Sequence, residues 1–305
     1  MRCEPSVRLS HRTLIDRLIK DIQSVNLTMR VSTETMCQLL GMNCNVPTDI
    51  CFSFTGFRKR GGDTDVHADG WGIAFFEGKG VRLFLDPQPS ARSQIAELVR
   101  RYPICSLNVI AHIRKATQGI VSLENTHPFQ RELWGTYWVY AHNGHLPQFH
   151  PALDGTFMPV GNTDSENIFC WLLQSLRQRF GDTPPTRDEL FNALHELTDP
   201  LSCMGIFNFL LCNGDCLFAH CSTELSYIVR RAPFKLAHLK DEDVMVDFSE
   251  VTTPNDRVAV IATQPLTDNE NWVTMEPGSL WLFHNGEVVT HRTTHPSPVK
   301  SLSGV

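Results

Sequence analysis

The chain has 305 residues, of which 42% are hydrophobic and 20% are charged, with a formal net charge of −6. This composition is typical of folded globular proteins, and the length allows one large or two ordinary domains. The negative charge gives no reason to expect a nucleic-acid or anionic-membrane partner, and the basic run FRKRGG, residues 57–62, indicates a solvated loop. No apolar stretch approaches the roughly 20 residues that a membrane-spanning helix needs.

The ten cysteines are spaced irregularly along a chain that is long for a disulfide-stabilised secreted domain. We therefore expect reduced thiols and a cytoplasmic location. The tightest group, CNGDCLFAHC at residues 212–221, lacks the two-residue spacing usual for zinc and crosses an expected hairpin whose alternate side chains point to opposite faces. We expect no bound metal.

The first part of the chain differs from the rest. Residues 13–25 place their apolar side chains on one helical face, which predicts a short amphipathic helix, and a polar linker follows. The segment has no signal-peptide apolar region, and its acidic residues argue against a transit peptide.

From residue 37 the pattern changes to short apolar runs divided by Gly-containing turns, which predict antiparallel strands and hairpins. The runs lie at residues 38–43, 70–85, 107–113, 137–144, 205–221, 257–263 and 279–291. Helical periodicity interrupts them at residues 90–101, 163–180 and 186–198, and the last two begin with Thr-x-x-Glu capping boxes. Grouped strands and grouped helices indicate an α+β fold.

Met36 and Cys37 stand where the two patterns meet. A thiolate is an effective nucleophile but needs a group to take its proton. Removal of Met36 would leave Cys37 with a free α-amine, whose ordinary pKa near 8 suits it to act as that base. The alternative interpretation of this dipeptide is a plain buried strand residue. Residues 1–36 leave three interpretations open: an incorrectly assigned start, a cleaved propeptide, or a real extension on an inactive or differently used protein.

Four downstream motifs follow in order. Arg114 ends an apolar run in AHIRKATQG, His127 precedes a proline in ENTHPF, Asn143 and Gly144 lie in YAHNGHL, and Asp164 begins a helix in GNTDSEN. Behind a Met-Cys pair, this order resembles the class II glutamine amidotransferases, whose nucleophile is the N-terminal residue, over about residues 36–291. The further motifs HADGWG, DPQPS, RELWG and TQPLTDNENW resemble the stand-alone YafJ-type branch of that family.

The resemblance implies a four-layer αββα sandwich, with two packed antiparallel sheets and helices outside. It divides the chain into residues 1–36, an extension not expected in the mature protein, residues 37–295, the amidotransferase domain, and residues 296–305, a C-terminal tail. The implied reaction is attack of Cys37 on the glutamine carboxamide, release of ammonia and hydrolysis of the thioester to glutamate. No metal or organic cofactor is needed.

The resemblance also assigns the substrate contacts. Arg114 would bind the α-carboxylate bidentately. Asp164 resembles the residue that takes the α-ammonium, although an acid in the first turn of a helix also simply offsets the helix dipole. Thr117 and His127 resemble residues that shape the glutamine pocket. Lys115 stands where many relatives have a large aromatic residue, so that wall of the pocket departs from the family pattern.

Asn143 and Gly144 resemble the oxyanion hole, a side-chain amide and a backbone N–H aimed at the tetrahedral oxygen. The sequence HNG occurs again at residues 284–286, and Asn-Gly is a common hairpin signal, so local sequence does not distinguish the two copies. Their order along the chain does, because the first copy lies between ENTHPF and Asp164 as in the family. We interpret Asn285 and Gly286 as an ordinary turn.

Three functions fit these residues. The first is a glutamine amidotransferase, which would hand ammonia to a separate acceptor protein because no synthase domain is visible after Asp164. The second is an amidohydrolase that cleaves a γ-glutamyl or related amide. The third is a non-catalytic, glutamine-binding regulatory module, which residues 1–36 would favour if they remain attached.

Overall fold

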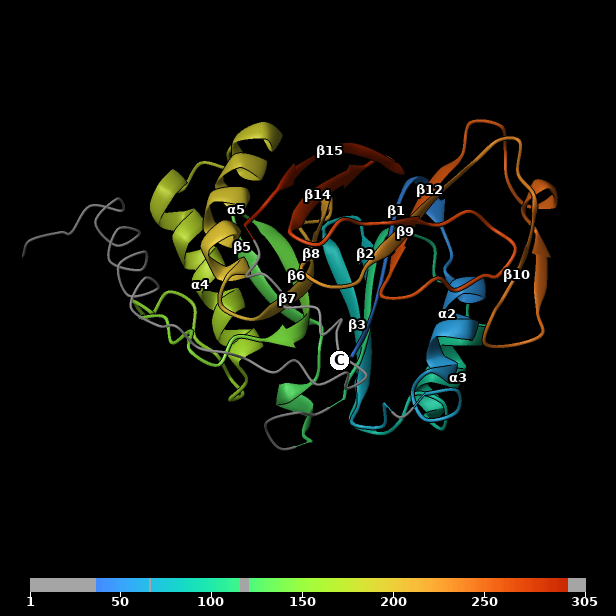
Figure 1. Ribbon diagram of the computed structural model, residues 1–305, viewed down its shortest axis with the longest axis horizontal. Helices are drawn as coiled ribbons and strands as arrows, with labels where there is room; N and C mark the ends of the chain where they lie inside the picture. Colours follow the sequence, from blue (N-terminus) through green and yellow to red (C-terminus); the bar gives the residue numbers. More distant parts are fainter. Residues whose placement is uncertain (1–36, 66, 116–120, 296–305) are drawn as a thin grey trace, which may run out of the picture. The chain divides into compact units, whose positions relative to one another are not determined.

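The computed structural model describes residues 37–65, 67–115 and 121–295, all of which belong to one compact unit, Thr35–Ser297. Figure 1 traces two β-sheets with helices on their outer sides. The helix expected at residues 13–25 and the pocket residue Thr117 lie outside the described residues, so both stay predictions.

The first sheet contains the strand that follows Cys37. In the described residues it has seven strands in the order β13-β9-β12-β1-β4-β2-β3, and its pairings are antiparallel. The strands are β1 (Gln38–Thr48), β2 (Trp71–Glu77), β3 (Gly80–Asp86), β4 (Ser106–Ile113), β9 (Ser226–Arg231), β12 (Arg257–Ala262) and β13 (Val273–Thr274). The apolar runs expected to form β1, β2, β3, β4 and β12 are confirmed as strands.

The second sheet is also antiparallel and, in the described part of the chain, has six strands in the order β15-β14-β8-β7-β6-β5. They are β5 (Phe129–Leu133), β6 (Thr136–His145), β7 (Ile206–Cys212), β8 (Leu217–Cys221), β14 (Ser279–His284) and β15 (Glu287–Thr293). A separate two-stranded ribbon pairs β10 (Leu236–His238) with β11 (Met245–Asp247).

Helices cover the outer face of each sheet (Figure 1). They are α2 (Cys51–Lys59) and α3 (Gln94–Arg101) on the first sheet, and α4 (Asp164–Phe180) and α5 (Arg187–Ser202) on the second. Two short 3₁₀ turns, η1 (Leu123–Asn125) and η2 (Phe248–Glu250), lie in connections. The arrangement confirms the predicted α+β fold with two antiparallel sheets between helical layers.

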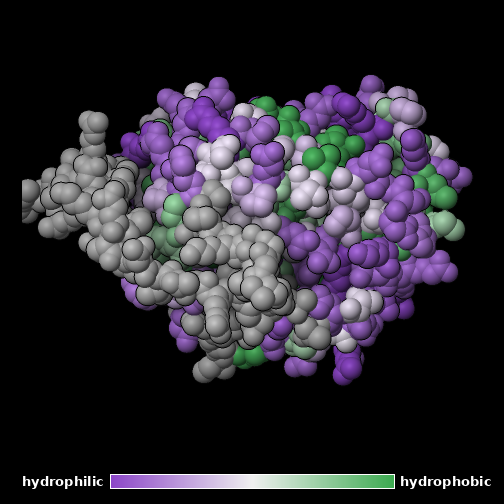
Figure 2. Space-filling model, viewed as in Figure 1, coloured by the Kyte–Doolittle hydropathy of each residue, from purple (hydrophilic) through white to green (hydrophobic). Residues whose placement is uncertain are grey.

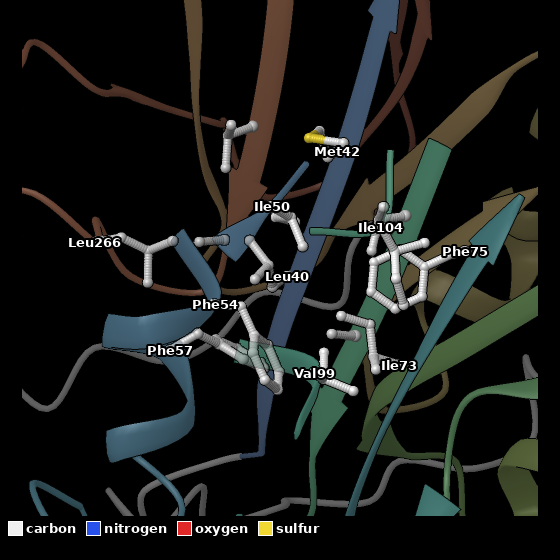
Figure 3. Packing of buried hydrophobic residues seen from close by; sticks show 14 of the residues in the cluster. Leu40, Met42, Ile50, Phe54, Phe57, Ile73, Phe75, Val99, Ile104 and Leu266 are labelled. Atoms are coloured by element: carbon white, nitrogen blue, oxygen red, sulfur yellow. The ribbon is translucent and has the colours of Figure 1, made fainter. Parts of the chain in front are cut away.

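The outer face of the first sheet forms one of two apolar cores. Phe54 and Phe57 of α2 point toward Leu40 of β1 and Ile73 of β2 in Figure 3, and none of these four residues is more than 1% exposed. Each such side chain contributes roughly 1.5–3 kcal/mol through its burial. This packing fixes α2 and β1 against each other.

The second core lies between the two sheets. Because successive strand residues point to opposite faces, Leu39 of β1 turns away from the core that receives Leu40. It packs in a cluster that includes Ile110 of β4 in the first sheet and Val139 and Leu210 of the second. The strand that follows Cys37 is therefore buried on both faces, which leaves its register little freedom.

The two capping boxes expected at helix starts differ in the structure. At α5, Thr186 accepts from the Glu189 amide and the Glu189 side chain returns to the Thr186 amide, so the complete box is confirmed. At α4, Thr163 accepts from the Glu166 amide at 3.2 Å, but the Glu166 carboxylate bonds elsewhere. Only half of that expected box forms.

The basic run at residues 57–62 is not the solvated loop that we expected. The helix α2 extends into it, and Arg58 and Arg60 are only 9% and 4% exposed. Arg60 donates to the main-chain oxygen of Gln264 at 3.0 Å and pairs with Asp241 at 2.8 Å. Burial of this cation is tolerated because it is paired and hydrogen-bonded, which composition alone does not reveal.

The surface in Figure 2 is mainly hydrophilic where it is coloured, with apolar residues in smaller patches. This distribution is ordinary, since much of the surface of any folded protein comes from apolar atoms. Within residues 37–65, 67–115 and 121–295, no helix has both the length and the apolar character that crossing a membrane requires.

Candidate active site

Cys37 lies directly before β1, at the end of the central strand of the first sheet. The antiparallel neighbour β4 ends at Ile113, opposite Gln38, so the residues after β4 come alongside Cys37. The Lys115 amide donates to Cys37 Sγ at 3.1 Å, and the thiol donates to the Lys115 carbonyl oxygen at 3.3 Å. The sulfur is thus held by the main chain of the AHIRKATQG motif.

The environment of Cys37 favours the protonated thiol. Burial raises its pKa, although the bond from Lys115 and the positive charge of Arg114 oppose this effect. A raised pKa leaves little thiolate near neutral pH, so nucleophilic attack from this site needs a base.

Arg114 is held beside the thiol by its own backbone. Its amide donates to the Gly70 carbonyl oxygen at 2.8 Å, and its carbonyl oxygen accepts from the Asp69 amide at 3.2 Å. The residue is 4% exposed, and burial lowers the pKa of its guanidinium while Cys37 and Asp69 oppose that shift. An arginine remains charged under these conditions, so the site contains the cation that a substrate carboxylate requires.

Asn143 reaches Cys37 from the second sheet, and Gly144 follows it near the end of β6. Asn143 is fully buried, and its Nδ2 donates to the Cys37 carbonyl oxygen at 2.5 Å. Gly144 has no room for a side chain, because a Cβ there would lie 1.9 Å from the Ile206 carbonyl oxygen. A side-chain amide donor next to a cysteine is one half of what an oxyanion hole for a cysteine nucleophile requires.

The second HNG copy has a different structure. Asn285 and Gly286 have φ values of 52° and 75°, the left-handed conformation that a type I′ hairpin turn demands, and they join β14 to β15. Asn143 and Gly144 instead lie within a strand. The interpretation of Asn285 and Gly286 as an ordinary turn is confirmed.

Asp164 begins α4 and directs its carboxylate to the end of β6. Oδ2 accepts from the Leu146 amide at 2.8 Å and lies 3.0 Å from His145 Nδ1, and Oδ1 accepts from the Ser165 amide at 2.8 Å. Burial would raise the pKa of Asp164, but His142, the Leu146 amide and His145 together lower it. The carboxylate therefore stays ionised, which suits an ammonium ligand as well as a helix start.

His127 lies in a buried aromatic group. Its ring centroid is 4.4 Å from that of His112 and 4.5 Å from that of Phe129, and among the described residues neither ring nitrogen has a hydrogen-bond partner. Burial lowers the pKa values of His127 and His112 well below the usual range, so both rings are neutral at physiological pH. A neutral ring can form a pocket wall but offers a substrate no charge.

The motifs ENTHPF and GNTDSEN are joined by a pair of asparagines. Asn125 Nδ2 donates to Asn162 Oδ1 at 2.9 Å, and the Asn162 amide donates to Asn125 Oδ1 at 3.0 Å. Nearby, the buried Glu166 accepts from the Gly161 amide at 2.7 Å and pairs with Arg131 at 2.5 Å. These bonds fix the loop before α4 and explain why Glu166 does not complete the capping box.

The segment CNGDCLFAHC does not gather its thiols into one site. Across the described residues, the group that brings three candidate ligand atoms within 4.8 Å is Asp215, Cys216 and His284. Arg187 lies 3.0 Å from His284 Nε2, and burial raises the pKa of Cys216 to about 12. A neighbouring cation and a protonated thiol both oppose metal binding. The nine described cysteines are all free.

Sequence reasoning missed several residues that hold the site in place. Arg60 donates to the side-chain oxygen of Gln38 at 3.3 Å, and the Leu39 amide donates to Thr263 Oγ1 at 2.9 Å, so both residues after Cys37 are fixed. Asn208 Nδ2 donates to the main-chain oxygen of Asn143 at 3.2 Å. Only Arg60 had a signal in the sequence, its place in a basic run.

The two packed antiparallel sheets and the order of the site motifs define a known class of protein. Residues 36–303 match the family described as class-II glutamine amidotransferases. The chain belongs to this family, and the predicted resemblance is confirmed.

Several relatives are similar over most of the chain. The YafJ protein of Escherichia coli (strain K12), named as a candidate glutamine amidotransferase, is 58% identical over 254 residues, which cover 83% of this chain and 100% of that protein. A similarly named protein of Haemophilus influenzae (strain ATCC 51907 / DSM 11121 / KW20 / Rd) is 53% identical over 256 residues, 84% of this chain and 87% of that protein. The 2.0 Å crystal structure of a predicted glutamine amidotransferase from Pseudomonas aeruginosa PA01 matches with a TM-score of 0.68 and 51% identity, covering 83% of this chain and 100% of that one.

Proposed function

We propose that this protein hydrolyses the carboxamide of glutamine through a Cys37 thioester and releases glutamate and ammonia. The observation that carries the proposal is the 2.5 Å bond from Asn143 Nδ2 to the Cys37 carbonyl oxygen, which supports Asn143 as an oxyanion donor because its side-chain amide lies beside Cys37. Glutamine also carries a carboxylate and an ammonium group, for which Arg114 and Asp164 supply opposite charges. We place the reaction in the cytoplasm, since the sequence suggests reduced thiols.

The proposed reaction has two halves. The Cys37 sulfur adds to the carboxamide carbon, and its proton passes through the base to the leaving nitrogen, which departs as ammonia. Water then adds to the thioester, and the bond to sulfur breaks to give glutamate and the free thiol. In each half the carbonyl oxygen carries negative charge, which Asn143 Nδ2 and the Gly144 amide would stabilise.

The base in this scheme is the α-amine of Cys37. With residues 1–36 attached, Cys37 has a peptide nitrogen, which cannot accept a proton at neutral pH. One comparison supports a mature chain that begins at Cys37, because the family match starts at residue 36.

We expect that protein isolated from its own host in active form begins at Cys37. N-terminal sequencing and intact mass of the fraction that releases glutamate from glutamine give the answer. Active protein that retains any residue before Cys37 would contradict both the processing and the proposed base. Protein that ignores glutamine but cleaves γ-glutamyl amides with larger leaving groups would favour the amidohydrolase function instead.

We expect Arg114→Ala to raise KM for glutamine roughly 10-fold to 100-fold with a smaller effect on kcat. A charged hydrogen-bonded contact contributes about 1.5–3 kcal/mol, and the α-carboxylate is bound equally before and during the reaction. Steady-state kinetics separate the two constants.

The matched variant is Arg114→Lys. It keeps the positive charge but loses the bidentate geometry, so its KM should fall between those of the wild type and Arg114→Ala. A loss confined to kcat in both variants would mean that Arg114 acts on the nucleophile and not on the substrate carboxylate.

A further inference from the structure

The carboxylate of Asp164 already accepts hydrogen bonds from neighbouring groups of the protein in the absence of substrate. Three hydrogen-bonding groups lie within 3.0 Å of its oxygens: the Leu146 amide, the Ser165 amide and His145 Nδ1. A carboxylate has about four acceptor positions, so an incoming ammonium group would have to bind alongside these neighbours. The two amides belong to the backbone and never change their charge, whereas a histidine side chain can be neutral or positively charged.

His145 and Asp164 line the same cavity. Its volume is about 290 Å³, close to the lower end of the range for small-molecule sites, and its other walls include Phe149, Asn162 and Asn167. The two side chains are 31% and 24% exposed. Solvent and a small polar ligand can therefore reach both partners of this pair.

Histidine is the side chain that ordinarily changes its charge near physiological pH, and His145 is the histidine that contacts the Asp164 carboxylate directly. Burial lowers the pKa of His142, and burial together with the charge of Asp164 raises the pKa of Tyr140 well above its usual range, so both stay neutral. Asp164 itself has a lowered pKa and remains ionised. His150 lines the same cavity and is exposed, but it has no hydrogen bond to Asp164.

We propose that His145 sets the affinity of this site for a free ammonium group. Neutral His145 donates one hydrogen bond to Asp164 and leaves the negative charge of the carboxylate available to the substrate. Protonated His145 forms an ion pair with the same carboxylate and competes with the substrate's ammonium. This inference rests on the proposed function, because it takes Asp164 as the partner of the α-ammonium of glutamine.

The test compares the pH dependence of KM in the wild type and in His145→Gln. Glutamine keeps an N–H donor for Asp164 but does not titrate. We expect the wild-type KM for glutamine to rise roughly fivefold from pH 8 to pH 5.5, the size expected for a partly exposed charge pair. KM of His145→Gln should stay level over this range. His150→Gln is the matched control and should keep the wild-type rise.

A second measurement does not depend on how the variant folds. Glutaramate, which is glutamine without its amino group, has no ammonium to compete with His145, so its inhibition constant against the wild type should not follow the same pH dependence. An equal rise for glutamine and glutaramate, or a rise that persists in His145→Gln, overturns the role of His145. Absence of glutamine turnover at every pH would instead overturn the proposed function.

Discussion

Cys37→Ala is expected to abolish glutamate release, with a loss of at least ~10⁴-fold in kcat, while the fold remains intact. Removal of a nucleophile that acts together with its base costs nearly the whole chemical acceleration. Cys37 precedes β1 and contributes a thiol bonded to the Lys115 backbone rather than a core side chain, so the alanine variant should fold. Glutamate release and thermal unfolding, measured on the same preparation, separate chemistry from stability.

The control for this variant is Cys51→Ala. Cys51 begins α2, and burial together with Asp49 raises the pKa of its thiol to about 12, so it is a poor nucleophile. We expect full activity from that variant. Labelling with an electrophilic glutamine analogue, followed by peptide mapping, should modify Cys37; modification at Cys44 or Cys51 would mean that a different thiol is the nucleophile.

Much of the fold was predictable from the sequence, because hydrophobic period and turn residues are local signals. The run after Cys37 formed β1, and the Asn-Gly pair at residues 285–286 formed the expected turn. The helix α2 was not predicted. It mixes polar and aromatic residues, and the packing of its Phe54 and Phe57 with residues of β1 and β2 is a tertiary contact that local sequence does not show.

The buried Arg58 and Arg60 show that local composition does not predict which charged residues are buried. Arg60 stands in a run that looks like a solvated loop, yet its partners Asp241 and Gln264 lie about 180 to 200 residues further along the chain. The sequence around Arg60 contains no signal for a partner so far along the chain. The same holds for Asn208, whose bond to Asn143 follows from the register of β6 and β7.

The site residues were found through the order of their motifs, and the structure adds their geometry. Cys37, Arg114 and Asn143 come together because β1 starts where β4 ends, and β6 of the other sheet brings Asn143 to the same point. The role of Asp164 was ambiguous in the sequence, and in the structure it accepts from the Ser165 amide at the start of α4 and from the Leu146 amide just after β6, so it connects the helix to that strand in any case. Its contact with a substrate stays a prediction.

Asn143→Ala should lower kcat by roughly 100-fold to 1,000-fold and leave KM for glutamine nearly unchanged. The amide donor would act mainly when the carbonyl oxygen of the substrate becomes negative, so its loss affects the transition state more than binding. The fold should survive, because the Asn208 bond goes to the main-chain oxygen of residue 143, which alanine retains. Asn143→Asp, which has the same shape but replaces the donor with a negative oxygen, should lose at least as much.

The second HNG copy provides the matched control. Asn285→Gly changes the corresponding residue at a position with φ of 52°, a conformation that glycine adopts without strain, so kcat and stability should stay near the wild-type values. Steady-state kinetics and thermal unfolding of the variants decide the assignment. A large loss of kcat in Asn285→Gly, with Asn143→Ala unaffected, would place the oxyanion donor in the β14–β15 turn. If Asn143→Ala instead raises KM without lowering kcat, Asn143 contributes to substrate binding in the ground state. The Gly144 amide would then be the only proposed donor to the oxyanion.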